Sequence, residues 1–275
     1  MKKILIRSIT GAIYVALIVA AMLCGPYALL GVFGCILVLA VIEMLKLCNN
    51  HQTLHPLTTA VDVLGGLGTF AASILHHAAG TSNSVTVAII AAYIIIRPTI
   101  QLYLKERNAI HELAASFAAQ LLVTLPLSLM NTIYFLPESG NLLLLASLVF
   151  IWVNDTGAFC VGSLIGKHRL FERISPKKSW EGFYGGLAFN ILTAWIIHSF
   201  FNGPFPGITL PEWMGLAVAV TVFSTWGDLV ESLIKRTAGT KDSGHILPGH
   251  GGILDRIDSL LQVVPGVMLY CYFIL

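Results

Sequence analysis

Charge is scarce in this sequence, and paired cysteines are missing. Only 11% of its 275 residues are Asp, Glu, Lys or Arg, whereas proteins average about 25%, which argues against an ordinary soluble enzyme. The five cysteines are scattered without a C-x-x-C pair. That scatter argues against a thiolate metal site or a disulfide framework, and we expect reduced thiols. No repeat of fixed period and no low-complexity linker divides the chain.

Hydrophobic residues take the place of the missing charge. They make up 56% of the chain, whose mean hydropathy is +0.81. Apolar runs of about 20 residues, the length needed to cross a bilayer, recur along it. We therefore predict an all-α, polytopic integral membrane protein with about nine transmembrane helices. The expected spans are 8–24, 27–46, 60–79, 85–104, 112–134, 141–160, 182–201, 212–232 and 258–275.

The first span has the form of a secretory signal, with basic residues followed by an apolar run. Cys24 follows Leu23 rather than a small residue, and further spans come after it. We interpret the segment as a retained helix, with a cleaved signal as the alternative.

The basic residues predict the topology. If the nine segments cross in alternation, all 16 Lys and Arg residues fall on one face and the opposite loops have none. The positive-inside rule then places the amino terminus in the cytoplasm and the carboxyl terminus outside. We expect a multi-pass protein of the cell inner (cytoplasmic) membrane with its active site facing the cytoplasm.

Two parts of the chain differ in chemical content. Residues 1–135 have almost no groups suited to chemistry, and we interpret them as transmembrane scaffold with a possible role in dimerisation. Residues 136–275 contain two long polar connections, about 161–181 and 233–257, which the topology places on the cytoplasmic side. We predict a catalytic transmembrane region there.

Four aspartates near the predicted inner boundary are the first candidates for a site. Asp155 and Asp228 lie near the inner ends of two spans, and Asp255 and Asp258 open the last one. A carboxylate at this depth is costly without a partner. Pairing with a nearby Lys or Arg is one compensation. The other is a hard cation such as Mg²⁺, which suits clustered carboxylate oxygens.

Basic and glycine residues surround these acids. Some bases match simple anchoring at an anionic leaflet, but those interspersed with Asp, Ser and Gly favour binding of phosphate groups. They are Lys177, Lys178, Lys235, Arg236 and Lys241. Gly249, Gly251 and Gly252 precede a predicted helix start, where close backbone approach and free N–H groups suit phosphate. For His250, contact with substrate and a structural hydrogen bond remain open.

Serines near the acids do not form a nucleophile motif. No G-x-S-x-G elbow is present, and no Ser-His-acid arrangement follows from the spacing. We interpret them as hydrogen-bonding or capping groups: Ser175, Ser179, Ser232 and Ser243.

The residues from Ser232 to Asp258 resemble a known signature. S-L-I-K-R, then K-D-S-G, L-P-G-H-G-G and D-R-I-D, at this spacing, are similar to the motif of phosphatidate cytidylyltransferases, also called CDP-diacylglycerol synthases. Upstream, D-T-G-A-F at 155–159, S-P-K-K-S-W-E-G at 175–182 and Gly227-Asp228 also resemble family motifs. Ser179 stands where threonine is often expected. The resemblance covers about 150–265.

The resemblance implies an enzyme that transfers CMP from CTP to phosphatidic acid, giving CDP-diacylglycerol and pyrophosphate. It implies Mg²⁺, with a second cation left open, and a homodimer in the lipid bilayer; nucleic acid is not an expected partner. The expected metal ligands are Asp228, Asp255, Asp155 and Asp258. The expected catalytic residues are Asp228, Asp255, Asp258, Lys235 and Lys241. The expected substrate-binding residues are Lys178, Ser175, Ser179, Ser232, Arg236, His250, Gly251, Gly252 and Arg256.

Two other functions are weighed against this one. A phosphatidyltransferase that uses CDP-lipid would carry a D-x-x-D-G-x-x-A-R pattern, which is absent. A secondary transporter would use the aspartates for Na⁺ or H⁺. The lack of internal repeats and the off-centre depth of the charged cluster argue against transport.

Overall fold

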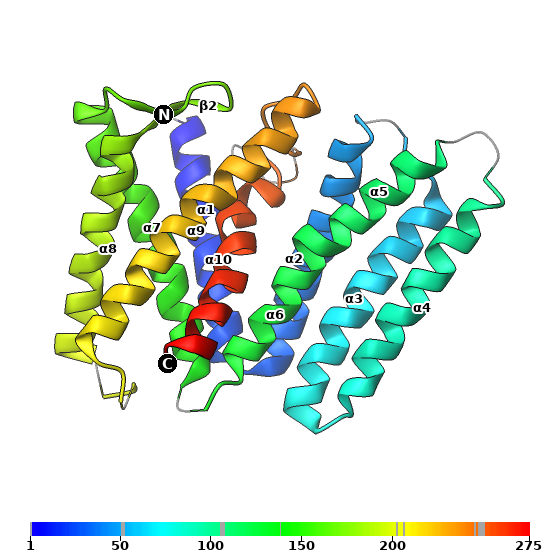
Figure 1. Ribbon diagram of the computed structural model, residues 1–275, viewed down its shortest axis with the longest axis horizontal. Helices are drawn as coiled ribbons and strands as arrows, with labels where there is room; N and C mark the ends of the chain where they lie inside the picture. Colours follow the sequence, from blue (N-terminus) through cyan, green and yellow to red (C-terminus); the bar gives the residue numbers. More distant parts are fainter. Residues whose placement is uncertain are drawn as a thin grey trace. The chain divides into compact units, whose positions relative to one another are not determined.

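The structure is a computed structural model (Figure 1). It describes residues 2–50, 53–104, 108–137, 139–201, 203–205, 207–244, 246 and 251–275, with side chains from residue 9 onward.

Helices make up most of the described chain. The first half contains α1 (Lys2–Leu23), α2 (Pro26–Cys48), α3 (Pro56–Ala79), α4 (Asn83–Gln101), α5 (Ala109–Ala119), the π-helical turn η1 (Gln120–Thr124) and α6 (Leu125–Tyr134). The second half contains α7 (Gly140–Ile165), strands β1 (Arg169–Phe171) and β2 (Ser175–Ser179), α8 (Trp180–Phe201), α9 (Leu210–Thr237) and α10 (Leu254–Phe273).

Each predicted span coincides with a helix, and the span 112–134 is formed by α5, η1 and α6 in succession. Within the described residues, seven helical segments are long and apolar enough to cross a membrane. The all-α, polytopic membrane class is therefore confirmed. The seven do not include α1, whose described apolar part is Ile9–Leu23, or α10. The count of nine crossings stays a prediction.

The sequence explains where several helices begin and end. Proline occupies the first turn of α2 and α3, where the missing N–H costs nothing. The side chain of Ser82 accepts a hydrogen bond from the amide of Ser84 and caps α4. Gly80 ends α3 in the left-handed region with φ 65°, which glycine adopts without steric cost.

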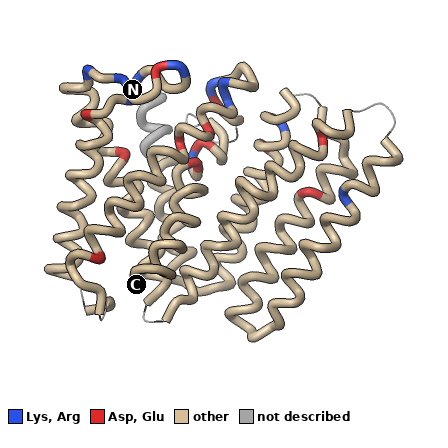
Figure 2. The backbone as a smooth tube through the Cα atoms, in the orientation of Figure 1, with Lys and Arg blue, Asp and Glu red and all other residues tan. Residues whose placement is uncertain are grey.

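A short hairpin joins α7 to α8, where we predicted only a connection. Its strands β1 and β2 are antiparallel, with Arg169 opposite Ser179 and Phe171 opposite Ser175. Figure 2 shows several Lys and Arg positions along the backbone of this hairpin. The S-P-K-K-S stretch therefore lies on an ordered strand next to the first turn of α8.

The chain forms two compact units that are interleaved in sequence. The first unit comprises residues 1–132 and 234–257, and the second comprises 133–233 and 258–275. The first unit thus contains the end of α9 and the start of α10 in addition to the amino-terminal helices. The proposed division of the chain at residue 135 stays a prediction.

A buried ion pair crosses the core of the first unit. Asp62 on α3 and Arg97 on α4 are each 1% exposed, and Arg97 Nε lies 3.2 Å from Asp62 Oδ1. The hydroxyls of Tyr93 and Ser116 each donate to Asp62 at 2.7 Å. Arg97 also donates to Ser116 Oγ at 3.0 Å and, from Nη1, to Gln101 Oε1 at 2.9 Å. We expected almost no groups suited to chemistry in residues 1–135, and this buried polar network is an exception.

The ion pair gives a stability prediction. Arg97→Met strands a buried carboxylate, and breaking such a pair costs about 3–5 kcal/mol. We expect a large fall in the midpoint of thermal unfolding in detergent. The double variant Asp62→Leu/Arg97→Met should unfold at a higher temperature than Arg97→Met, because no uncompensated charge remains.

Arg173→Met, at an exposed arginine of the hairpin turn, is the matched control and should leave the midpoint unchanged. A double variant no more stable than Arg97→Met would contradict a pairing role for Asp62.

Candidate active site

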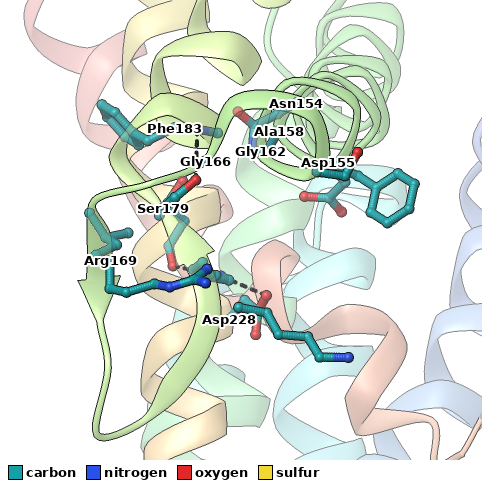
Figure 3. Close-up of a pocket in the computed structure, with 16 residues that line it drawn as sticks. Asn154, Asp155, Ala158, Gly162, Gly166, Arg169, Ser179, Phe183 and Asp228 are labelled. Atoms are coloured by element: carbon teal, nitrogen blue, oxygen red, sulfur yellow. Dashed lines mark hydrogen bonds and ion pairs between the residues drawn. The ribbon is translucent and has the colours of Figure 1, made fainter.

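A cavity of about 570 Å³ opens in the second unit between α7, α8, α9 and the hairpin (Figure 3). Polar and charged side chains form one part of its wall: Asn154, Asp155, Ser163, Arg169, Lys177, Lys178, Ser179, Thr225 and Asp228. Apolar and glycine residues form the rest: Ala158, Phe159, Gly162, Gly166, Leu170, Gly182 and Phe183. A wall of this kind suits a ligand with both a charged and an apolar part.

Close packing of α7 on α8 forms one side of the cavity. A Cβ added at Gly182 would lie 2.9 Å from the carbonyl oxygen of Ala158, and one at Gly157 would lie 2.9 Å from Phe189. Larger residues would push the helices apart. Ser179 Oγ also accepts a hydrogen bond from the amide of Gly182 at 3.1 Å. The serine thus caps the start of α8, as the sequence predicted.

Asp228 faces the cavity from α9 and is held by two side chains. Lys178 Nζ, on β2, lies 2.6 Å from Asp228 Oδ2. The Ser232 hydroxyl donates to Asp228 Oδ1 at 3.1 Å from the next turn of the same helix. Both side chains of the ion pair are partly exposed, at 25% for Lys178 and 35% for Asp228, so the pair is accessible from the cavity.

Asp155 lines the same cavity from α7 and is exposed. The structure therefore brings together two of the four predicted carboxylates, Asp155 and Asp228 (Figure 3). Asp258, also in the second unit, is not among the residues that line the cavity. Its Oδ1 accepts from the amide of Ser259 at 2.6 Å.

Asp255 belongs to the first unit and has a dense set of donors. Lys235 Nζ lies 2.7 Å from Oδ1. Oδ2 accepts from the Ser243 amide at 2.9 Å, from the Ser243 hydroxyl at 3.0 Å and from the Gly252 amide at 2.9 Å. A carboxylate offers about four lone-pair sites, so these donors use most of its capacity.

The pKa of Asp255 reflects this environment. The carboxyl lies ahead of the predicted span 258–275. Burial raises its pKa, but hydrogen bonds from Lys235, Gly252 and Ser243 and the charge of Lys235 outweigh burial. The net pKa is below the ordinary value, so Asp255 is ionised throughout the neutral range.

Glu43 on α2, which sequence analysis did not select, contacts residues of the motif region. It is 2% exposed and accepts hydrogen bonds from the Ser243 hydroxyl at 2.8 Å and from the amides of Ile253 and Leu254 at 3.0 and 2.9 Å. A glutamate inside an apolar span is costly. Its presence in the run 27–46 was therefore a usable signal.

Other predicted residues fall outside the cavity or outside the described residues. Ser175 begins β2, Arg236 donates to the carbonyl of Thr240 at 3.0 Å, and Lys241 and Arg256 are exposed. Gly251 has φ 84°, a conformation that favours glycine. His250 and Gly249 lie outside the residues that the structure describes. Arg169, which sequence analysis did not select, lines the cavity.

The metal prediction can be compared with these donors. Across the described ranges, no group of three or more His, Cys, Asp or Glu side chains could hold a metal ion. Mg²⁺, however, is usually bound by one or two carboxylates together with substrate phosphates and water. Asp155 and Asp228 on one cavity fit that requirement. The metal roles of Asp255 and Asp258 stay predictions.

Comparison with known proteins agrees with the motifs. The model of the cytidylyltransferase family matches residues 5–274, so the chain belongs to this family. It is 42% identical over 140 residues to a phosphatidate cytidylyltransferase of Haemophilus influenzae, covering 50% of this chain and 49% of that one. A Bacillus subtilis protein of the same name is 44% identical over 140 residues, covering 51% and 49%. The chain spans about half the length of the curated relatives it matches.

The contacts of Asp255 give a pH prediction. Asp255→Asn removes the negative charge that accepts these hydrogen bonds. Each hydrogen bond to a charged group contributes about 1.5–3 kcal/mol to the stability of the fold. We expect a clear loss of thermal stability at pH 7. Because the folded pKa is depressed, the stabilisation is present above the unfolded value of about 3.9 and is lost as pH falls through the folded pKa.

We would measure the midpoint of thermal unfolding of wild type and Asp255→Asn over a series of pH values. The difference between the two midpoints should become smaller at the lowest pH values. Asp242→Asn, at an exposed acid near Ser243, should lie close to wild type at every pH. A constant difference between wild type and Asp255→Asn down to the lowest pH would contradict the depressed pKa.

Proposed function

We propose that this chain is a phosphatidate cytidylyltransferase, which makes CDP-diacylglycerol and pyrophosphate from phosphatidic acid and CTP for phospholipid biosynthesis. The observation that carries the proposal is the cavity of the second unit. It combines carboxylates, basic side chains and an apolar wall in a membrane protein of the cytidylyltransferase family. The names of the relatives support the same substrates.

The proposed reaction needs little proton transfer. The nucleophile is a phosphate oxygen of the lipid, which attacks the α-phosphorus of CTP and expels pyrophosphate. A phosphate monoester has a second pKa of about 6, so the attacking oxygen is already largely ionised at neutral pH. The main task is to hold two anions in line and to stabilise the leaving group. This agrees with a cavity wall whose described residues include carboxylates and bases but no histidine.

The basic side chains of the hairpin are suited to hold the two substrates. Arg169, Lys177 and Lys178 line one cavity, and Arg can bind phosphate oxygens with two hydrogen bonds at once. Phe159 on the same wall is 75% exposed and offers a contact for acyl chains. Lys235, Arg236 and Lys241 keep their predicted roles as further phosphate ligands.

Mg²⁺ is part of the proposal, with Asp155 and Asp228 as the residues that would hold it in the second unit. When bound, it would supply charge neutralisation for the triphosphate and the leaving pyrophosphate. The ion pair of Lys178 with Asp228 orients the carboxylate and satisfies its charge. Lys178 is thus both a phosphate ligand and a competitor for the metal-binding carboxylate.

The proposed setting is the cell inner membrane, with nine crossings, a cytoplasmic amino terminus, an external carboxyl terminus and the active site facing the cytoplasm. The agreement of all nine apolar segments with helices supports this topology. Alternating crossings of these segments would also put every Lys and Arg residue on one face, as the positive-inside rule requires. A soluble nucleotide and a lipid then reach the site from the aqueous and membrane sides. A homodimer completes the proposal.

The decisive variant is Asp228→Asn. We expect pyrophosphate release that requires both CTP and phosphatidate to fall at least about 100-fold, because a metal-binding and charge-stabilising group is lost. Glu172→Gln, at an exposed acid in the hairpin turn, should retain wild-type turnover. Near wild-type turnover of folded Asp228→Asn would remove this carboxylate from the mechanism. Ion-driven flux in proteoliposomes without CTP would instead favour a transporter.

The variant Lys178→Met separates the two proposed roles of Lys178, which are to bind phosphate and to compete with Mg²⁺ for Asp228. Loss of a phosphate ligand should lower kcat/KM by about 10-fold or more, as expected for about 1.4 kcal/mol of binding. Loss of the competing ammonium should at the same time reduce the Mg²⁺ concentration needed for half-maximal activity. A higher Mg²⁺ requirement in Lys178→Met would contradict the competition.

A further inference from the structure

Glu43 lies far in sequence from the residues that it contacts. Its partner Ser243 is 200 residues away, and both belong to the first unit. Glu43 accepts hydrogen bonds from Ser243, Ile253 and Leu254. These donors lie in the segments 243–244 and 252–254, which we call the two arms. Between the arms the sequence carries part of the family motif. Glu43 therefore joins an amino-terminal helix to the motif region.

Two carboxylates cap the start of α10. The first amides of a helix have no partner within the helix, and negative charge is favourable at this end. Glu43 accepts from the amides of Ile253 and Leu254, and Asp255 accepts from that of Gly252. The amide donors at 252–254 are thus already bound to carboxylates. A phosphate would have to displace a carboxylate to reach them.

Glu43 also explains two glycines of the arms. A Cβ added at Gly244 would overlap Glu43 alone, with 3.0 Å to Cδ and less to Oε1. A Cβ at Gly252 would overlap both Ser243 Oγ and Glu43 Oε2. Neither glycine has a positive φ. The requirement for glycine at these positions therefore comes from the space that the glutamate occupies.

Ser243 couples Glu43 to Asp255. Its hydroxyl lies 2.8 Å from Glu43 Oε2 and 3.0 Å from Asp255 Oδ2. A hydroxyl has one hydrogen to donate, so the two carboxylates share it. Asp255 in turn holds Lys235 at 2.7 Å. A change in the charge of Glu43 would therefore reach the Asp255–Lys235 pair through this shared hydroxyl.

We propose that Glu43 is a positioning residue for cytidylyl transfer. Its carboxylate fixes both arms and, through Ser243, sets the orientation of Asp255 and Lys235. The proposal rests on the proposed function, in which Asp255 and Lys235 act on the substrates. It assigns a role in the reaction to the amino-terminal half of the chain.

The first test compares Glu43→Gln with wild type. Glutamine keeps the size of the side chain but replaces one carboxylate oxygen with an NH₂ group. This group is a donor, so it cannot accept a hydrogen bond from the donors of the arms. We expect kcat/KM for CTP to fall about 10- to 100-fold, as is typical when a group that orients site residues is lost, while the amount of folded protein and the lipid KM change little. Glu112→Gln, at another buried acid of the first unit, should keep wild-type kinetics. Wild-type kinetics in Glu43→Gln, or a loss explained by less folded protein, would overturn the proposal.

The second test introduces Gly244→Ala into wild type, Glu43→Gln and Glu43→Ala. The midpoint of thermal unfolding is measured for each protein with and without Gly244→Ala. The added methyl should destabilise wild type and Glu43→Gln, whose side chains fill the space, but add little in Glu43→Ala, where the space is empty. An equal cost of Gly244→Ala in all three backgrounds would show that Glu43 does not pack against this arm.

The two hypotheses fail in different ways. If the wild-type chain shows no pyrophosphate release that depends on CTP and phosphatidate, the proposed function fails. The Gly244→Ala measurements need no turnover and still test the position of Glu43. If Asp228→Asn behaves as expected and Glu43→Gln has wild-type kinetics, only the positioning role is rejected.

Discussion

A carboxylate inside an apolar helical bundle must find donors, and this requirement organises both units. Asp62 is held by Arg97 and two hydroxyls, Asp255 by Lys235 and the residues near α10, and Asp228 by Lys178 and Ser232. In each case the donors come from more than one segment of the chain. The acids therefore determine which elements must meet, and apolar packing fills the space between them.

Much of the fold follows from the sequence, because apolar runs and breaks between them are local properties. Pro26, Pro56 and Gly80 mark helix boundaries directly, and all nine predicted segments are helical. The hairpin was missed because three-residue and five-residue strands with charged side chains have no periodicity to detect. The interleaving of the two units also has no local signal, since it depends on contacts between distant segments.

The sequence predicts which residues belong to the candidate site but not which of them contact one another. Motif spacing selected Asp155, Asp228 and Lys178, which line one cavity. Spacing could not show that Lys178 is the partner of Asp228, because the two lie on different elements. Glu43 was missed because it is a single acid within the apolar run 27–46, far in sequence from the polar connections that contain the motifs. Its identification required the contacts with Ser243 and α10.

The long separation between Glu43 and Ser243 has a consequence for biosynthesis. A ribosome makes about 5–20 residues per second, so α2 is in place for at least several seconds before its partner has been synthesised. During that interval the glutamate has none of its three donors from the arms. A chain that stops before residue 243 therefore leaves the buried carboxylate of Glu43 without any of these three donors.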